Sequence, residues 1–95
     1  MPRVTPVEVS HPILDSMFDK SNVWGRIRAG DLSSDIIKSK PSSTWPNATS
    51  QIIKHFTVDG KHVATTHRVV QDSDGRVLHW DAKDFRLKGI CYWRA

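Results

Sequence analysis

Arg68 and His79 are the two side chains of the C-terminal half whose chemistry best suits a phosphodiester. A guanidinium can bind a phosphate through two parallel hydrogen bonds, and an imidazole can gain or lose a proton near neutral pH. Cleavage of RNA without a metal needs a proton-transfer group and a cation that stabilises the charge developing on the phosphate. We therefore predict that His79 transfers the proton and that Arg68 binds the phosphate, provided that the fold makes them neighbours.

A β-hairpin at Asp59-Gly60 begins the arrangement that would bring them together. Asp-Gly between two runs of alternating side chains is the strongest short signal for a hairpin turn. The runs here are Gln51–Val58 and Lys61–Val70. A tight turn between them predicts these cross-strand pairs: Phe56 with Val63, His55 with Ala64, and Gln51 with Arg68.

A second turn, Asp72-Ser73-Asp74-Gly75, leads into a strand over 76–81. Its loop length predicts further pairs: Gln71 with Arg76, Val69 with Leu78, Arg68 with His79, and Thr66 with Asp81. Directly opposed residues have Cβ atoms about 5 Å apart, so four side chains would form a compact quartet: Thr66, Arg68, His79 and Asp81.

Each remaining member of this polar group has a predicted role. Asp81 would orient or charge the imidazole, and Thr66 would hydrogen-bond a phosphate oxygen. His55, at the border of the quartet beside Gln51, would be the second acid or base. The alternative is that these side chains only solvate an exposed sheet face, since such faces are normally polar.

Alternation along the strands predicts one apolar and one polar face of the sheet. The apolar face collects Ile52, Phe56, Val58, Val63, Val69, Leu78 and Trp80, of which Phe56, Val63, Val69, Leu78 and Trp80 should be buried. The polar face collects His55, Thr57, His62, Thr66, Arg68, His79 and Asp81, with Ile53, Ala64, Val70 and Val77 among them. His67 falls on the apolar side, which predicts a hydrogen-bonded core histidine.

Helical signals dominate the first half of the chain. Ser10 is a predicted N-cap, with Pro12 in the first turn of the helix. The apolar residues that follow recur at helical spacing: Ile13, Leu14, Met17 and Phe18. A second short helix is predicted over 22–29, ended by Gly30. Ser33 or Ser34 would cap one more helical turn through 35–37, and residues 40–46 would form an extended loop.

These elements predict a single α+β domain over residues 1–95. Residues 1–50 form its helical and loop half, and residues 51–95 form an antiparallel β-meander of four to five strands. Its last hairpin would turn at Lys88-Gly89, between 85–87 and 90–93. The short N-terminal helices would pack on one face of the sheet.

Composition is that of an ordinary globular protein, with 38% hydrophobic and 25% charged residues. A net charge of +4 suits an anionic partner such as RNA. No apolar run has the length of a membrane span, and residues 1–10 show no hydrophobic signal segment. We therefore expect a cytoplasmic protein without a membrane partner. The one cysteine, Cys91, cannot form an internal disulfide and is predicted to pack as a small hydrophobic residue.

The sequence predicts neither a metal nor a cofactor. Five histidines could suggest zinc, but His62 and His67 are predicted on opposite faces and no cysteine pair accompanies them. At the C-terminal end, Tyr92, Trp93 and Arg94 could stack on nucleic-acid bases, or they could form a last edge strand.

The layout resembles that of the small bacterial ribonuclease toxins of the barnase–EndoU–RelE type. Those proteins also place short N-terminal helices before a four-stranded antiparallel sheet, and they carry His, Arg, Lys and Thr on its open face. The resemblance is one of architecture over most of the chain and includes no family-specific motif. It implies a metal-independent ribonuclease, a toxin domain acting in its own or a target cell's cytoplasm. Such a basic toxin would meet an acidic antitoxin or immunity protein.

A binding protein without catalysis is the alternative interpretation. The same sheet face or the Trp-rich edge would then hold nucleic acid or a protein partner, as in an inhibitor or accessory protein. The charge balance is compatible with both functions.

Overall fold

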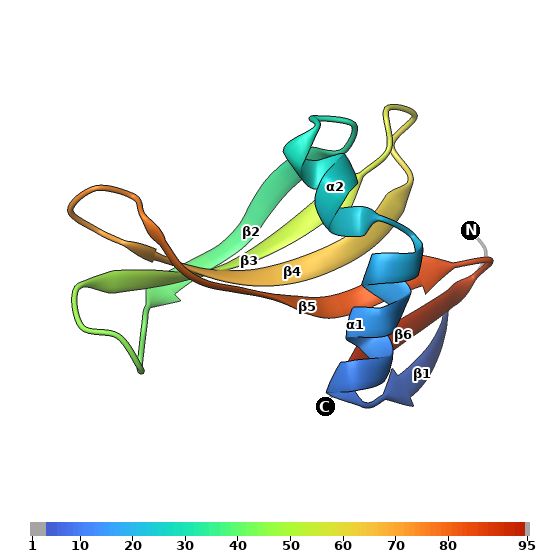
Figure 1. Cartoon of the computed structure of the whole chain (residues 1–95), viewed down its shortest axis with the longest axis horizontal. Helices are drawn as coiled ribbons and strands as arrows, with labels where there is room; N and C mark the ends of the chain where they lie inside the picture. The colour runs from blue at the N-terminus through green and yellow to red at the C-terminus, as the bar shows by residue number, and fades with distance from the viewer. Residues whose placement is uncertain (1–3, 95) are drawn as a thin grey trace.

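A computed structural model describes residues 4–94 as a six-stranded sheet with two short helices (Figure 1). The elements in chain order are β1 (Thr5–Val9), α1 (His11–Lys20), α2 (Val23–Arg28), β2 (Ser33–Pro41), β3 (Ala48–Phe56), β4 (His62–Gln71), β5 (Val77–Leu87) and β6 (Ile90–Arg94). The strand order is β1-β6-β5-β4-β3-β2, and all neighbours are antiparallel except β1 and β6. The predicted α+β class is confirmed, but the sheet is mixed and larger than the predicted meander. Neither helix is long and apolar enough to cross a membrane.

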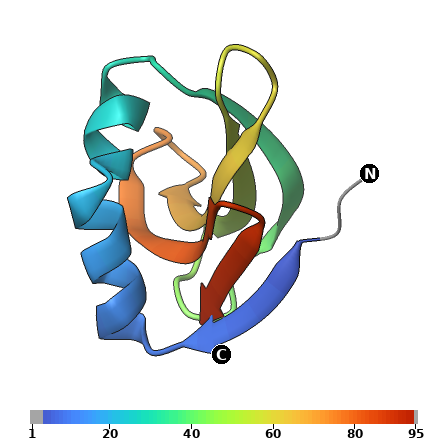
Figure 2. The same ribbon diagram turned by 90° about the vertical axis from the view of Figure 1, so that its right-hand side faces the viewer.

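Helix α1 begins where its sequence predicts. The Ser10 side chain accepts a hydrogen bond from the Ile13 backbone N–H at 3.4 Å, and a proline occupies the first turn. Leu14 and Phe18 are fully buried, whereas Ile13 is half exposed. Figure 2 shows both helices along one side of the curved sheet, where the apolar stripe of α1 meets β5.

Gly25 of helix α2 lies close to the Asn22 side chain. A Cβ atom at this position would lie 2.3 Å from the Asn22 side-chain oxygen, so a larger residue there would require the Asn22 side chain to move. Asn22 itself has a left-handed backbone (φ 53°), and Gly30 ends the segment at φ 78°. The helix then presents Trp24 to Phe18 and to Trp80, with ring centroids 5.3 and 5.4 Å apart.

Residues 33–41 form the edge strand β2, so the predicted helical turn at 35–37 is wrong. The strand pairs with β3 and carries a bulge between Ile36 and Lys38. Strand β1 was not predicted either, and it pairs with β6 near the other end of the chain. Strand β2 pairs with the next strand along the chain, whereas β1 pairs with a segment distant in sequence. In both cases pairing within the sheet overrides weak local preferences.

Three β-bulges set the register of the central strands. Gln51 opposes Arg68 and His55 opposes Ala64, as predicted, but Phe56 opposes His62 because Val63 is an extra residue. Between β4 and β5 the extra residues are Leu78 and Lys83. The bulge at Leu78 slips the predicted register by one residue, giving these pairs: Val69 with His79, Arg68 with Trp80, His67 with Asp81, and Thr66 with Ala82. A one-residue slip moves side chains to the opposite face of the sheet.

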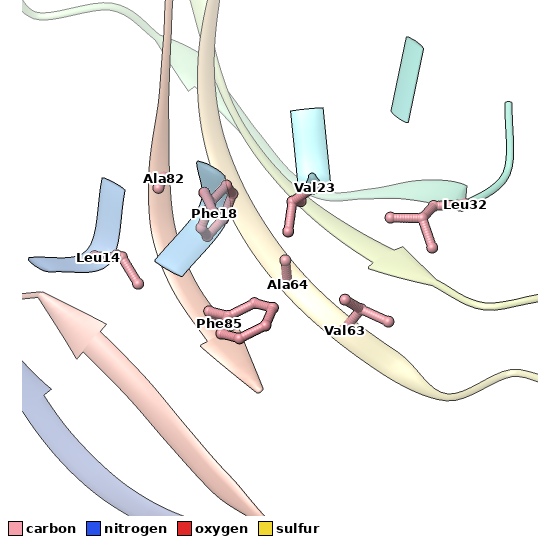
Figure 3. Close-up of a cluster of buried hydrophobic side chains, with 8 residues drawn as sticks. All are labelled: Leu14, Phe18, Val23, Leu32, Val63, Ala64, Ala82 and Phe85. Carbon is pink, nitrogen blue, oxygen red and sulfur yellow. The ribbon is translucent and has the colours of Figure 1, made fainter. Parts of the chain in front are cut away.

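The core lies between the helices and strands β4 and β5 (Figure 3). Its buried members are Leu14, Phe18, Val23, Leu32, Val63, Ala64, Ala82 and Phe85. The helices therefore cover the face that carries Ala64 and Thr66, which was predicted to be the polar one. Of the five side chains predicted to be buried, Val63 and Val69 are, whereas Phe56, Leu78 and Trp80 are partly exposed. Val58, also placed on the apolar face, is 99% exposed in the hairpin turn.

Candidate functional site

The structure divides the predicted quartet between the two faces of the sheet. Thr66 and Arg68 lie on the face that the helices cover, which we call the helix face. His79 and Asp81 lie on the uncovered side, which we call the open face, because they oppose Val69 and His67 on β4. The predicted adjacency of Arg68 with His79, and of Thr66 with Asp81, is therefore wrong.

His55 is a buried structural residue on the helix face. Its Nδ1 lies 2.8 Å from Ser34 Oγ, and its Nε2 lies 2.8 Å from Thr66 Oγ1. Thr66 also accepts a hydrogen bond from Trp80 Nε1 at 2.9 Å. Burial, aided by the positive charges of His62 and Arg68, lowers the pKa of His55 to about 4. His55 is thus neutral at pH 7 and fully buried, which argues against its predicted role as second acid or base.

Arg68 is held at the margin of the same face. Its Nε donates a hydrogen bond to Gln51 Oε1 at 2.9 Å, and its guanidinium lies 5.1 Å from the centre of the Trp80 ring. Burial lowers the pKa of Arg68. The predicted pairing with Gln51 is confirmed, but Arg68 cannot share a phosphate with His79 across the thickness of the sheet.

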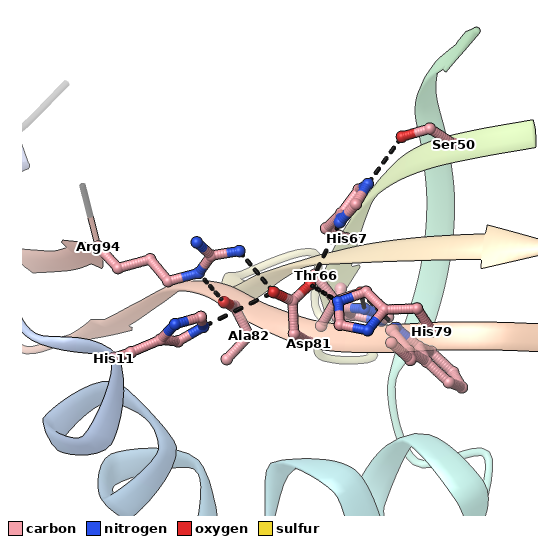
Figure 4. A network of polar contacts seen from close by, with 10 residues as sticks. His11, Ser50, Thr66, His67, His79, Asp81, Ala82 and Arg94 are labelled. Carbon is pink, nitrogen blue, oxygen red and sulfur yellow. Dashed lines mark hydrogen bonds and ion pairs between the residues drawn. The ribbon is translucent and has the colours of Figure 1, made fainter. Parts of the chain in front are cut away.

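On the open face, Asp81 gathers four basic side chains (Figure 4). Its Oδ1 lies 3.3 Å from His67 Nδ1 and 3.4 Å from His79 Nε2. Its Oδ2 lies 2.5 Å from Arg94 Nη2 and 3.6 Å from His11 Nε2. We call these residues the Asp81 cluster: His11, His67, His79, Asp81 and Arg94. The Asp81 side chain is only 16% exposed, so its charge is weakly screened by water.

Neighbouring groups orient three members of the cluster, His67, His79 and Arg94. Ser50 Oγ lies 2.7 Å from His67 Nε2, the nitrogen that faces away from Asp81. The Trp45 ring stacks on His79 with centroids 5.6 Å apart and planes 25° apart. Arg94 Nε donates a hydrogen bond to the Ala82 carbonyl at 2.7 Å. The two imidazoles are therefore held in place, while their side chains remain 27% and 41% exposed for His67 and His79.

A basic groove of about 440 Å³ adjoins the cluster. It is lined by Ile37, Lys38, Lys40, Ser50, Ile52, His67, Lys83 and Arg94. A smaller hollow of about 180 Å³ continues past His67 and Ser50 to Trp45. None of these lining residues is acidic, so the groove suits an anionic ligand.

Three residues of the Asp81 cluster could together hold a metal ion. One ligand atom each from His67, His79 and Asp81 lies within 4.8 Å of the other two. His62 takes no part, because its Nε2 is engaged by the Ala64 carbonyl at 2.9 Å and by Thr65 Oγ1 at 3.0 Å.

Sequence reasoning missed His67, Ser50 and Arg94. His67 was predicted to be a core histidine because alternation along its strand placed it with Val63 and Val69 on the predicted apolar face, whereas the helices cover the opposite face, which carries Ala64. A register one residue along would have placed His67 opposite Asp81, but no residue in the second turn signals the bulge at Leu78. Arg94 lies on the last strand, β6, but this strand is not the edge strand that one alternative for the C-terminal end predicted, because β1 pairs with its outer side. Comparison with protein-family models, curated proteins and solved structures finds no match to this chain.

Proposed function

We propose that the open face cleaves RNA without a metal ion, with His67 and His79 as the acid–base pair. The observation that carries the proposal is the pair of partly exposed imidazoles, with centroids 5.9 Å apart, that share one oxygen of Asp81 beside the basic groove. His79 keeps the proton-transfer role expected from the sequence. His67 replaces His55 as its partner, and Arg94 and Lys83 replace Arg68 as the cations.

Transesterification of RNA needs two proton transfers at one phosphate. A base removes the proton of the 2′-hydroxyl, which attacks phosphorus, and an acid protonates the departing 5′ oxygen. One carboxylate balances the charge of one imidazolium, so two imidazoles that share Asp81 can hold a base and an acid together. The spacing of the two rings leaves each within reach of one side of a phosphate.

The cations around the site would bind the phosphate and its neighbours. Lys40 and Lys83 line the groove beside His67, and Arg94 reaches it while bound to Asp81. Cations placed where charge develops stabilise the transition state of phosphoryl transfer. Trp45, partly exposed and stacked on His79, offers an aromatic surface on which a base could stack.

The decisive experiment is incubation of purified protein with an oligoribonucleotide in excess EDTA. Cleavage is expected, with a 2′,3′-cyclic phosphate product, whereas the matching oligodeoxyribonucleotide should stay intact because it lacks the attacking hydroxyl. His79→Ala should slow cleavage roughly 10²–10⁴-fold, the usual contribution of a general acid or base. His62→Gln is the matched control, since His62 shares β4 with His67 but lies outside the cluster. No cleavage by the parent protein, or equal cleavage by His79→Ala, would refute the proposal.

Binding of nucleic acid without cleavage is the second candidate, supported by the basic groove and by Trp45. In that case the protein would retain RNA at low salt and release it steeply as salt rises, because each neutralised phosphate releases counterions. A toxin that acts with an acidic antitoxin or immunity protein remains part of the first proposal, and the groove would be the surface that such a partner covers.

A further inference from the structure

We propose that His67, His79 and Asp81 bind a divalent transition-metal ion of the zinc class, and that the bound ion switches off the proposed cleavage. Tetrahedral zinc has bonds of about 2.0–2.1 Å to nitrogen and oxygen, which place neighbouring ligand atoms about 3.4 Å apart. Asp81 Oδ1 lies 3.3 Å from His67 Nδ1 and 3.4 Å from His79 Nε2. Two edges of a zinc tetrahedron are therefore already present, and the third ligand pair lies within 4.8 Å.

Asp81 Oδ1 supplies an independent reason for a cation at this point. This oxygen is buried, and among residues 4–94 no donor makes a hydrogen bond to it. The two imidazole nitrogens lie within ion-pair distance of it without hydrogen-bond geometry. A buried carboxylate oxygen without a donor is costly. An ion held between the oxygen and the two nitrogens would satisfy all three atoms.

The surroundings of the three ligands are those of an outer coordination shell. Metal-bound histidines usually pair their second ring nitrogen with an oxygen atom, as His67 Nε2 does with Ser50 Oγ at 2.7 Å. Arg94 and His11 occupy Asp81 Oδ2, which leaves Oδ1 for the metal. Trp45 fixes the ring of His79 by stacking on it.

The ligand types select the metal and its fourth ligand. Two imidazoles with one carboxylate favour zinc, cobalt, nickel or copper over magnesium or calcium, which prefer oxygen atoms alone. Three protein ligands leave one tetrahedral position open, and the exposed edges of His67 and His79 allow entry from solvent. The cations of the adjoining groove, Lys40, Lys83 and Arg94, favour an anion at that open position.

The inhibitory part of this inference rests on the proposed function. A coordinated imidazole nitrogen holds the metal through the lone pair that would otherwise accept a proton. With His67 Nδ1 and His79 Nε2 both coordinated, the pair could not exchange the two protons that RNA cleavage needs. Metal binding and acid–base catalysis by these two side chains would therefore exclude each other.

Binding is tested without RNA, by titrating the metal-free protein with Co²⁺ and recording visible absorption. The expected result is one ion per chain with the intense bands of a tetrahedral site, displaced by Zn²⁺. His79→Ala and Asp81→Asn should each weaken affinity at least roughly 10–100-fold, the loss known for outer-shell changes alone. His62→Gln should bind as the parent does. Because His79 is partly exposed, His79→Ala should keep its fold, which circular dichroism checks. No Co²⁺ binding by the parent, or binding unchanged in His79→Ala, would overturn the site.

Inhibition is tested separately, by adding Zn²⁺ to the cleavage reaction after EDTA is removed. Cleavage should stop at the Zn²⁺ concentration that saturates the site in the Co²⁺ competition. Cleavage that continues at saturation, or that appears only with Zn²⁺, would overturn the inhibitory role. If Co²⁺ binds but RNA is never cut, the proposed function fails and the metal site stands; if RNA is cut but no metal binds, the reverse holds.

Discussion

Each face of the sheet carries a histidine beside a hydroxyl group, but this histidine is buried on one face and partly exposed on the other. On the helix face, His55 lies between the hydroxyls of Ser34 and Thr66, fully buried and without a carboxylate. On the open face, His67 lies between the hydroxyl of Ser50 and the carboxylate of Asp81, within reach of solvent. Burial makes the first histidine a neutral part of the core. The second histidine is partly exposed beside a carboxylate, where the proposed proton transfer or metal binding would take place.

The largest expected effect is the difference in RNA cleavage rate between variants of His67 and His55. His67→Ala should slow RNA cleavage roughly 10²–10⁴-fold because it removes one of the two proton-transfer groups. His55→Gln should leave the cleavage rate of folded protein within a few-fold of the parent, and lower the free energy of unfolding by about 1–3 kcal/mol through disturbed buried hydrogen bonds. The initial rate of RNA cleavage and the free energy of unfolding in urea are measured for both variants. A loss of cleavage in folded His55→Gln would instead restore His55 to the site.

The free energy of unfolding should decrease at acidic pH, because His55 binds a proton more readily in the unfolded chain. Its pKa falls from 6.5 to about 4 on folding, so between these pH values the unfolded chain binds the extra proton and the folded protein does not. Stability should therefore be highest above about pH 6.5 and fall by up to about 3 kcal/mol as the pH drops towards 4. His62, whose pKa is lowered mainly by burial, acts in the same direction.

Urea unfolding at a series of pH values measures this slope, and His55→Gln provides the control. The variant has no imidazole at position 55, so its stability should depend less on pH over the same range. Equal slopes for parent and variant would show that His55 is not the group responsible.

Thr66→Val should destabilise the protein without affecting cleavage. The substitution keeps the shape of the side chain but removes the oxygen that Trp80 Nε1 and His55 Nε2 share. Two buried nitrogens then lack a partner, which should lower the free energy of unfolding by about 1–3 kcal/mol. Thermal unfolding measures the change. Reduced cleavage with unchanged stability would support the phosphate-binding role first predicted for Thr66.

The smallest effects should come from the lysines of the groove. Lys40→Ala and Lys83→Ala should each weaken RNA binding a few-fold and lower the slope of log affinity against log salt by about 1 per lost phosphate contact. Lys61→Ala, in the distant hairpin turn, is the matched control and should change neither quantity. Fluorescence anisotropy with an uncleavable oligonucleotide measures both. Equal effects at all three positions would indicate binding by overall charge rather than by the groove.

Local signals in the sequence predicted much of the fold. Ser10 and Gly30 bound the helical region as expected, and Lys88-Gly89 turns the last hairpin. The central hairpin turns at the predicted place, but Thr57 rather than Val58 pairs with Lys61, so the turn is one residue longer than predicted. Each of these features depends on a few adjacent residues, on a capping side chain or a left-handed backbone. The candidate site was predicted less well. Of the residues predicted for it, only His79 and Asp81 lie in the Asp81 cluster. Its other members come from β4, β6 and the start of α1.

The sequence by itself determined the α+β class, the positions of the turns and the net positive charge. The tertiary structure alone decided which side chains share a face. The reason is the two-residue period of a strand: one extra residue at Leu78 moves His79 and Asp81 away from Arg68 and Thr66, and places Asp81 opposite His67. The docking of the helices then decides which face is buried, so that His55 becomes part of the core and His67 lies at the surface.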